Sequence, residues 1–413
     1  MQRMMVSVCL SFMALSCGIT EIGGNSADRP SGGHIWGGMD SAQEGVSGLH
    51  TTCYVTALDY QKGYDWRSDQ AVGSVKCSLV VYADNVPVMK LPVGDEYEVS
   101  SDPDMHRIVD GNLYTDYSTD KETVIKKNGR QLFRYLGRES ICGFEIIGHD
   151  IYTLGQSREG PGFSFRKNGE AVVSREDGYV MGGLVNSGDS LCFAFYEQIK
   201  TSDGHVGRYY ASVGGKVSQI AVRDDIVNIW DALVLRDKVI YIASLVGIPT
   251  PVVFDGKSMI SLSIPVGATV VSCRFCPSGE SYIIETLCRY SNGKGANVLY
   301  HNGKVAVAFS GDVTVSALTM YDGGIFCAMN PVSSNDAGSI YCSGETYQMP
   351  EGYNVMGDDC VNVIDGIMHV GLSSIEGKCP IIWRDGHIDS LKINGYLSTI
   401  YFRESEEISL PTQ

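Results

Sequence analysis

The chain has 413 residues, of which 44% are hydrophobic and 19% are charged. Its 48 acidic residues outnumber its 32 Lys and Arg residues and give a net charge of −16, which argues against binding to nucleic acid or to an anionic membrane surface, because both need clustered cations. The 48 glycines against 13 prolines are typical of many short strands joined by tight turns, and argue against a helix-rich enzyme.

The N-terminus has the pattern of an export signal. A short basic start is followed by an apolar stretch from Met4 to Ser16, which is too short to span a bilayer as a helix but suits the core of a signal peptide. The stretch ends in Ala14-Leu15-Ser16-Cys17-Gly18, which resembles the lipobox of bacterial lipoproteins. By that resemblance a signal peptide at 1–16 is removed and Cys17 carries lipid. The alternative is an ordinary cleaved signal with an incidental cysteine.

The next segment is rich in Gly, Ser and Asp up to residue 48. This composition is typical of a flexible tether, so we expect a lipid anchor and tether at 17–48. No later stretch is long and apolar enough for a membrane-spanning helix. We therefore expect membrane contact only through the anchor at Cys17.

One hairpin pattern recurs along the rest of the chain. An apolar or aromatic strand ends in a two-residue turn and a second short strand follows, most clearly around Asn168-Gly169, Asn302-Gly303 and Asp385-Gly386. Such pairs between alternating apolar residues are a strong hairpin signal, because both turn residues need positive φ. Weaker copies stand at residues 84–85, 128–129, 214–215, 255–256 and 343–344.

The spacing of these hairpins predicts a β-propeller. The second turn residues stand at positions 85, 129, 169, 215, 256, 303, 344 and 386, a mean interval of 43 residues, and four-stranded propeller blades repeat about every 40–50 residues. We expect an all-β fold, a single propeller of eight four-stranded blades over residues 49–413. Seven blades would result if the copy at 84–85 were an extra hairpin.

The two ends of the repeat predict how the ring closes. Each unit has two apolar runs before its hairpin, so its strands are named a to d in chain order. The first recognisable strand, at 52–58, looks like a b strand without an a strand, whereas residues 396–402 look like an a strand without a b strand. We therefore expect the C-terminal strand to complete the first blade, which leaves no open sheet edge.

The loops predict which face carries recognition. In this topology the b–c and d–a loops share one face of the ring, and the c–d and a–b turns share the other. The c–d turns are minimal and we expect long, varied b–c loops, so function is expected on the b–c/d–a face. The longest b–c loop, 59–69, contains Tyr64, Trp66 and Arg67, which are favoured types in binding hot spots. The alternative is an insertion whose aromatic side chains cover the adjoining blade.

Further candidates for ligand binding on this face come from other blades. They are Arg158, His205, Arg208, Arg289 and Tyr290. His205 is expected in a long b–c loop, where an imidazole could act as a general base. The spacing singles out no catalytic pair, and the sequence contains no phosphate-binding loop, hydrolase elbow or HExxH motif, so we assign no catalytic residue.

The d–a loop of the first blade is the one segment that could hold a cation. Residues 92–106 carry five carboxylates, and Ca²⁺ takes six to eight oxygen ligands. Their spacing matches no EF-hand loop, so we expect a solvated acidic loop and predict no metal or cofactor. The five residues are Asp95, Glu96, Glu98, Asp102 and Asp104.

The cysteines do not predict a disulfide framework. Of 13 cysteines, Cys9 lies in the signal and Cys17 at its end, and the remaining 11 are an odd number that cannot all pair. Most stand inside apolar runs, so we expect small buried side chains. The motif Cys273-x-x-Cys276 has no second pair or His cluster of the kind that a structural zinc site needs.

The blades also carry a family resemblance. With aromatic-x-Asn-Gly hairpins such as Tyr300-His301-Asn302-Gly303, the chain resembles a group of bacterial envelope β-propeller lipoproteins. The resemblance implies an exported, lipid-anchored protein on either side of the outer membrane, and implies no activity. We expect a monomeric, non-catalytic binding or scaffold protein with a protein or glycan partner. The alternative is a carbohydrate-active hydrolase or lyase with its site in the central funnel.

Overall fold

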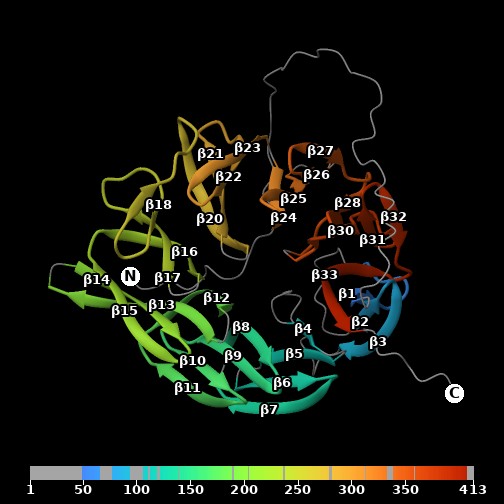
Figure 1. Ribbon diagram of the computed structural model, residues 1–413, viewed down its shortest axis with the longest axis horizontal. Helices are drawn as coiled ribbons and strands as arrows, with labels where there is room; N and C mark the ends of the chain where they lie inside the picture. Colours follow the sequence, from blue (N-terminus) through green and yellow to red (C-terminus); the bar gives the residue numbers. More distant parts are fainter. Residues whose placement is uncertain are drawn as a thin grey trace.

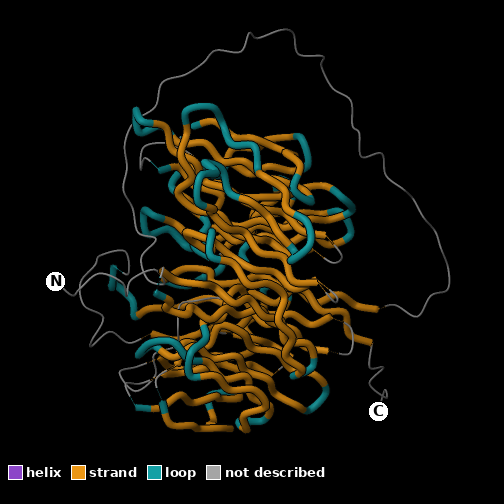
Figure 2. The backbone as a smooth tube through the Cα atoms, turned by 90° about the vertical axis from the view of Figure 1, so that its left-hand side faces the viewer, coloured by secondary structure: helices purple, strands orange, loops and turns teal. Residues whose placement is uncertain are grey.

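The computed structural model is a closed ring of eight antiparallel β-sheets (Figure 1). No helix occurs in the residues that it describes, and Figure 2 shows only strands and loops there. In the same residues, no segment qualifies as a helix that could cross a membrane. The expected eight-bladed propeller is therefore confirmed. The described residues are 49–65, 77–93, 106–109, 112–118, 121–137, 139–187, 190–202, 204–235, 238–278, 281–311, 313–332, 338–357 and 359–406.

Each blade runs from an inner strand to an outer strand, and the blades are numbered around the ring from the N-terminus. From the centre outward, blade 1 consists of β33 (Gly395–Glu406), β1 (Leu49–Tyr60), β2 (Cys77–Ala83) and β3 (Val86–Val93). Blade 2 consists of β4 (His106–Val109), β5 (Asn112–Ser118), β6 (Glu122–Lys127) and β7 (Arg130–Leu136). Blade 3 consists of β8 (Glu139–Ile147), β9 (Asp150–Ser157), β10 (Phe163–Lys167) and β11 (Glu170–Arg175). Blade 4 consists of β12 (Tyr179–Ser187), β13 (Ser190–Thr201), β14 (Gly204–Val213) and β15 (Lys216–Arg223).

The remaining four blades follow the same order. Blade 5 consists of β16 (Ile226–Leu235), β17 (Lys238–Leu245), β18 (Val252–Phe254) and β19 (Met259–Ser261). Blade 6 consists of β20 (Ala268–Ser278), β21 (Ser281–Tyr290), β22 (Gly295–His301) and β23 (Lys304–Ser310). Blade 7 consists of β24 (Val313–Tyr321), β25 (Gly324–Pro331), β26 (Ser339–Cys342) and β27 (Glu345–Gln348). In blade 8, β28 (Tyr353–Asn354) and β29 (Val361–Ile364) share the inner position and both pair with β30 (Ile367–Ser374), which is followed by β31 (Ile381–Arg384) and β32 (His387–Ser390).

The C-terminal strand closes the ring, as expected. β33 pairs antiparallel with β1 from Leu49↔Glu406 to Asp59↔Gly395, with one irregularity at Thr56/Ala57. The largest apolar cluster of the described residues spans blades 7, 8 and 1 and includes Leu397 of this strand. The join between the two chain ends is therefore packed as a core and not only hydrogen-bonded.

The Asn-Gly turns connect strands c and d as the sequence predicts. Asn168 and Gly169 have φ values of 51° and 86°, the left-handed conformation that this turn requires. The Asn168 side chain also accepts a 2.9 Å hydrogen bond from the backbone N–H of Ile151, at the start of the b strand. Asn128 accepts the same bond from Leu113 N–H at 2.9 Å. Asparagine suits this position because it tolerates positive φ and also ties the turn to the b strand.

Blade 5 departs from the expected two-residue turn. Residues 255–258 form a longer connection between β18 and β19, and the Asp255 carboxylate accepts hydrogen bonds from the backbone N–H groups of Lys257 and Ser258 at 2.9 and 2.8 Å. Asp255-Gly256 is therefore a side-chain-stabilised Asx turn, although it keeps the place of the c–d turn in the repeat.

Several turn glycines lie close to the preceding blade. A Cβ atom on Gly169 would lie 3.4 Å from the Phe133 side chain, on the outer strand of the preceding blade. The same neighbour relation joins Gly129 to Leu91 at 3.4 Å and Gly303 to Ile260 at 3.6 Å. These turns lie in van der Waals contact with the blade before them, and their positive φ values favour glycine over other residues.

The b–c connections are mostly short, contrary to expectation. Residues 61–76 join β1 to β2, but only residues 202 and 203 join β13 to β14. His205 therefore lies in β14, opposite Lys200 in the ladder, and not in a long loop. The b and c strands of blade 4 continue beyond the core, where backbone hydrogen bonds hold polar segments whose composition resembles a loop.

A carboxylate connects the inner strands of blades 5 and 6. Asp231 accepts hydrogen bonds from the N–H of Phe275 and from the N–H of Ala232, both at 2.7 Å. Burial raises the pKa of Asp231 to about 6, although the two N–H groups and Arg274 act in the opposite direction. This carboxyl group is therefore more easily protonated in the folded chain than in the unfolded chain.

The shifted pKa predicts a pH dependence of stability. Between about pH 4 and pH 6 the folded state binds a proton at Asp231 that the unfolded state has lost, so the free energy of unfolding falls as the pH rises through this window. The expected loss is on the order of 2 kcal/mol. We expect Asp231→Asn to remove this part of the profile when urea unfolding of dilute protein is compared at pH 4 to 7. Identical profile shapes for the parent and the variant would contradict it.

Candidate functional site

A hollow lies where blade 8 meets blade 1, on the face of the b–c and d–a loops. We call it the loop-face groove; its volume is about 680 Å³. Its walls come from the b–c loops of blades 1 and 8, from strands β2 and β3, and from the connection that leads into β33. The lining residues are Asp59, Tyr60, Gln61, Lys62, Gly63, Ser78, Lys90, Gly377, Cys379, Lys392, Ile393 and Asn394.

Asn394 holds the two sides of this groove together. Its side-chain amide donates to the backbone carbonyls of Gln61 and Tyr64, both at 3.0 Å. Its backbone N–H donates to the Asp59 carboxylate at 3.2 Å, and its carbonyl accepts from Tyr60 N–H at 2.8 Å. The connection before β33 is thus fastened to the start of the b–c loop of blade 1, which gives the groove a fixed wall.

The charge of the lining differs in sign from the charge of the chain. Three lysines, Lys62, Lys90 and Lys392, line the groove, and Asp59 is its one carboxylate among the lining residues. Lys90 Nζ binds Asp59 Oδ2 at 2.7 Å. In a chain of net charge −16, this is a local excess of positive charge that favours an anionic ligand.

The aromatic part of the groove is held rigidly. The ring of Tyr60 lies 5.4 Å from that of Tyr64 and 6.4 Å from that of Tyr396 between centroids. Burial, followed by the neighbouring Tyr396, raises the pKa of Tyr60, so its phenol stays neutral at physiological pH. The groove therefore presents cations and neutral hydrogen-bonding groups.

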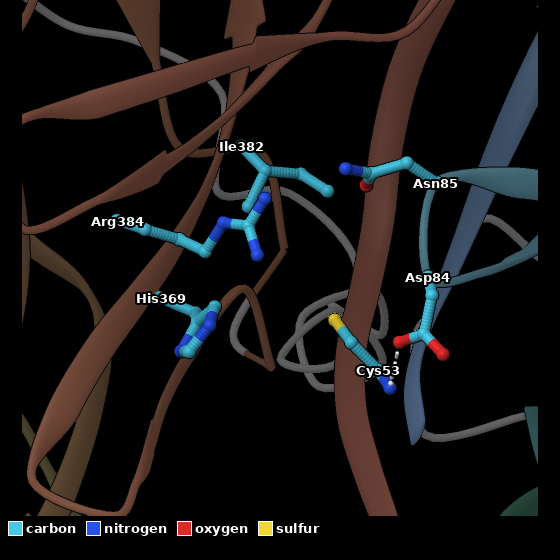
Figure 3. A pocket seen from close by; sticks show the side chains of 6 residues that line it. All are labelled: Cys53, Asp84, Asn85, His369, Ile382 and Arg384. Atoms are coloured by element: carbon cyan, nitrogen blue, oxygen red, sulfur yellow. Dashed lines mark hydrogen bonds between the residues drawn. The ribbon is translucent and has the colours of Figure 1, made fainter. Parts of the chain in front are cut away.

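A second, smaller hollow lies on the opposite face of the same blade pair. This turn-face cavity has a volume of about 120 Å³ and is lined by Cys53, Asp84, Asn85, His369, Ile382 and Arg384. Figure 3 shows the blade 8 side chains facing those of blade 1. The blade 1 turn is Asp84-Asn85 and carries no glycine, unlike the turns that lie closely against the preceding blade.

The thiol and imidazole of the turn-face cavity are not set up as a nucleophile and base. Burial and Asp84 raise the pKa of Cys53 to about 11, against the opposing effect of Arg384, so the thiol stays protonated at neutral pH. Burial lowers the pKa of His369, and its Nδ1 lies 3.2 Å from the Ile367 carbonyl. We assign no ligand to this cavity.

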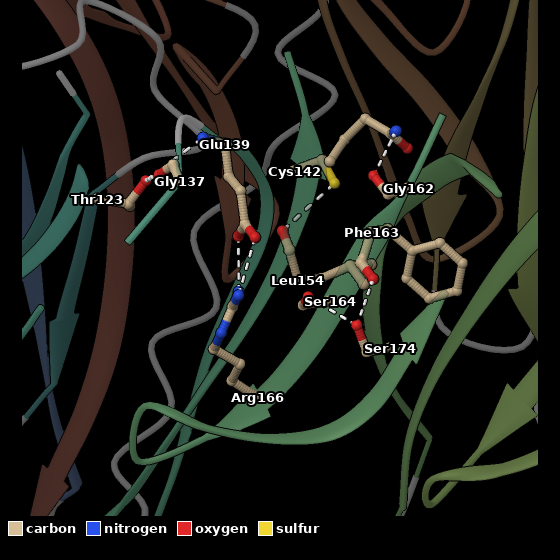
Figure 4. Close-up of polar contacts among 11 residues, drawn as sticks. Thr123, Gly137, Glu139, Cys142, Leu154, Gly162, Phe163, Ser164, Arg166 and Ser174 are labelled. Atoms are coloured by element: carbon tan, nitrogen blue, oxygen red, sulfur yellow. Dashed lines mark hydrogen bonds and ion pairs between the residues drawn. The ribbon is translucent and has the colours of Figure 1, made fainter. Parts of the chain in front are cut away.

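A third polar cluster is sealed between blades 2 and 3 and has a structural role. Arg166 donates two hydrogen bonds to the Glu139 carboxylate, at 2.6 and 2.8 Å (Figure 4). The guanidinium lies 4.0 Å from the centre of the Tyr135 ring. The carboxylate also passes directly over Gly155, where a Cβ atom would collide with it. The two side chains are only 10% and 11% exposed, so the pair supports the packing of blade 3 against blade 2.

The sequence candidates do not converge on one site. Tyr64 adjoins the loop-face groove through its carbonyl and ring, but neither hollow is lined by Arg158, Arg208, Arg289 or Tyr290. Arg158 binds Ser140 Oγ at 2.8 Å in blade 3. Arg208 lies in β14 and Arg289 and Tyr290 lie in β21. Trp66 and Arg67 lie outside the described residues, as do Cys17 and the acidic loop residues Asp95 to Asp104.

The sequence analysis missed the residues that complete the groove. Lys392 and Asn394 lie more than 300 positions from Tyr60 and Lys62 in the chain. The signal that could have found them is the predicted ring closure. Pairing the C-terminal strand with the first b strand necessarily places the segment before it beside the b–c loop of blade 1.

The described cysteines are all free thiols, and Cys379 alone among them is exposed. Cys273 and Cys276 contact different partners, the Thr286 hydroxyl at 3.1 Å and the Leu318 carbonyl at 3.2 Å. The expectation of small buried side chains is confirmed for six of the other ten, and the remaining four, Cys53, Cys142, Cys276 and Cys342, are partly buried. Within the described parts of the chain, no group of three or more His, Cys, Asp or Glu side chains could hold a metal ion.

Comparison with known proteins identifies similarity of fold. No family model and no curated protein matches the sequence. The β-propeller domain of the Trilobed protease from Pyrococcus furiosus is 12% identical, with 70% of this chain and 94% of that chain covered and a TM-score of 0.41. Acylaminoacyl peptidase from Pyrococcus horikoshii is 9% identical over 79% of this chain and 57% of that chain, with a TM-score of 0.44. TolB from Acinetobacter baumannii is 14% identical, with coverages of 70% and 81% and a TM-score of 0.32.

Proposed function

We propose that this propeller is a non-catalytic binding protein of the bacterial envelope, and that its glycan or protein partner docks in the loop-face groove. The observation that carries the proposal is the positive lining of a groove of about 680 Å³ in a chain of net charge −16. That volume lies within the range of about 300–1,000 Å³ for ligand pockets. The Asn394 hydrogen bonds support it further, because a fixed wall reduces the ordering cost of binding.

The groove supports binding better than glycoside hydrolysis. Most glycosidases use two carboxyl groups about 5–10 Å apart, one as acid and one as base or nucleophile. Among the lining residues Asp59 is the one carboxylate, and Lys90 and the Asn394 N–H already bind it. One carboxylate cannot supply both roles of such a pair.

A bulky substitution in the groove wall tests this assignment. Ser78 lies on β2 and lines the groove, so we expect Ser78→Trp to fill part of it and weaken binding at least tenfold on a glycan array or to a purified partner. Val88→Trp is the matched control, because Val88 lies on β3 of the same blade and is 56% exposed.

The same array also tests for catalysis. We expect each bound glycan to be recovered unchanged after incubation with the parent protein. Turnover of any of them would overturn the binding-only proposal. Equal binding by Ser78→Trp and Val88→Trp would place the binding site elsewhere on the propeller.

We also propose that the protein is exported and anchored through lipid on Cys17. The support is the sequence resemblance to a lipobox, since Cys17 lies outside the described residues. In cells grown with labelled palmitate, the parent should incorporate label, and Cys17→Ser should lose it. Cys379→Ser, which removes an exposed thiol of the propeller, should keep the label. Retained label in Cys17→Ser would refute the anchor.

A further inference from the structure

We infer that the ligand of the loop-face groove is an acidic glycan, a sugar chain that carries carboxylate groups. The inference rests on the proposed function, since it names the class of ligand for the same groove. It follows from two features of the lining that act together, namely unpaired cations and groups that recognise hydroxyls.

The cations converge on the groove from three separate elements. Lys62 belongs to the b–c loop of blade 1, Lys90 to β3, and Lys392 to the connection before β33. Both Lys62 and Lys392 are exposed, and within the described residues no carboxylate pairs with either of them. An ammonium group carries three N–H donors, so both can bind the carboxylates of a ligand without first breaking an ion pair.

The other lining groups match a sugar better than an acidic peptide. Ser78 and Gln61 can both donate and accept hydrogen bonds, and the Asp59 carboxylate keeps lone pairs beyond those used by Lys90 and Asn394. Sugar hydroxyls donate and accept, so they can use this set. A polyglutamate chain has no hydroxyl group, so it lacks the one group that can donate and accept at the same atom.

The aromatic wall fits the same ligand. Tyr60 lines the groove and is held in place by Tyr64 and Tyr396. A ring that is already fixed contributes apolar contact area at little loss of conformational entropy. The apolar face of a sugar ring can lie against it while the carboxylate of the same or the next sugar reaches a lysine.

The exposed thiol of Cys379 provides a direct readout of groove occupancy. Cys379 lines the groove and is the exposed cysteine among those described, so a ligand in the groove should slow its modification by a maleimide dye. The assay uses the full chain, and the rate for Cys379→Ser is subtracted to remove labelling at other cysteines. The probes are oligogalacturonate, a neutral malto-oligosaccharide of equal length, and a polyglutamate peptide.

We expect oligogalacturonate to slow Cys379 labelling and the other two probes to leave it unchanged. The double variant Lys62→Gln/Lys392→Gln should weaken the protection about tenfold, as expected for two exposed charge contacts. The control is Lys216→Gln/Lys304→Gln, two exposed lysines that directly follow c–d turns on the opposite face, and it should behave like the parent.

The other outcomes separate this inference from the proposed function. Protection by the neutral sugar to the same degree, or by polyglutamate alone, would overturn the acidic glycan while leaving a binding groove in place. Protection by oligogalacturonate that survives in Lys62→Gln/Lys392→Gln would also overturn it, because the cations would not be responsible. No protection by any probe would reject the inference, and the array with Ser78→Trp would then decide the proposed function alone.

Discussion

A chain that ends at residue 394 should fail to fold cooperatively. The truncation removes β33, which pairs with β1 from Leu49↔Glu406 to Asp59↔Gly395. It would leave blade 1 without its inner strand and expose both the N–H and C=O groups of β1 and the apolar cluster that spans blades 7, 8 and 1. We expect loss of the unfolding transition in urea and binding of a hydrophobic dye, both monitored by fluorescence.

Point substitutions in the same strand separate packing from strand pairing. Leu397 and Ile400 are 0% and 1% exposed, so Leu397→Ala and Ile400→Ala should each cost about 2–5 kcal/mol in the free energy of unfolding. Ile388→Ala is the control, because Ile388 is 52% exposed on the outer strand of blade 8 and should change stability by less than about 0.5 kcal/mol. A truncated chain that unfolds at the same urea concentration as the parent would show that the ring does not depend on its closing strand.

The blades and the closing strand could both be predicted from the sequence, for different reasons. Each Asn-Gly hairpin is a local signal, because φ preference and one side-chain hydrogen bond decide the turn within a few residues, as at Asn168. Eight such signals at a regular interval are enough to predict blades. The closing strand was predictable for a second reason: the first b strand and the C-terminal a strand each lack a partner in their own neighbourhood.

The extents of individual strands were less predictable. β13 and β14 run past the core to Thr201 and Gly204, and their outer parts carry Lys200 and His205. Neither hydrophobic periodicity nor turn residues mark such segments as strands. Their residues pair because extending an existing hairpin gives each further backbone N–H and C=O group a hydrogen-bond partner.

The sequence pointed to the loop that borders the groove but not to the residues that line it. The first b–c loop was singled out by Tyr64, Trp66 and Arg67, but the residues through which it lines the groove are Gln61, Lys62 and Gly63. The lysines that give the groove its charge come from a loop, an outer strand and a connection, and each is an ordinary surface residue in its own sequence context. These lysines lie together only because the ring closes at this point. They could have been found from the sequence only by asking which loops the predicted ring closure brings together.

The buried Arg166–Glu139 ion pair of blade 3, which faces Tyr135 of blade 2, should be highly sensitive to substitution. The side chains of Arg166 and Glu139 are 10% and 11% exposed and their atoms approach to 2.6 Å. Removal of one partner leaves the other charge buried without compensation, so we expect Arg166→Met to cost about 3–5 kcal/mol. Lys167→Met is the neighbouring control: Lys167 pairs with Asp150 at 2.7 Å but is 44% exposed, so its loss should cost less than about 1 kcal/mol.

The double variant distinguishes an uncompensated charge from lost packing. If the cost of Arg166→Met comes from the Glu139 charge that it leaves behind, Glu139→Gln/Arg166→Met should recover most of it, because a neutral amide is far less costly to bury than a carboxylate. Urea unfolding of the two single variants and the double variant gives the coupling free energy between the positions. A double variant as unstable as the sum of the two single variants would mean that the pair acts through the packing of the long Arg166 side chain against Tyr135, and that its charges contribute little.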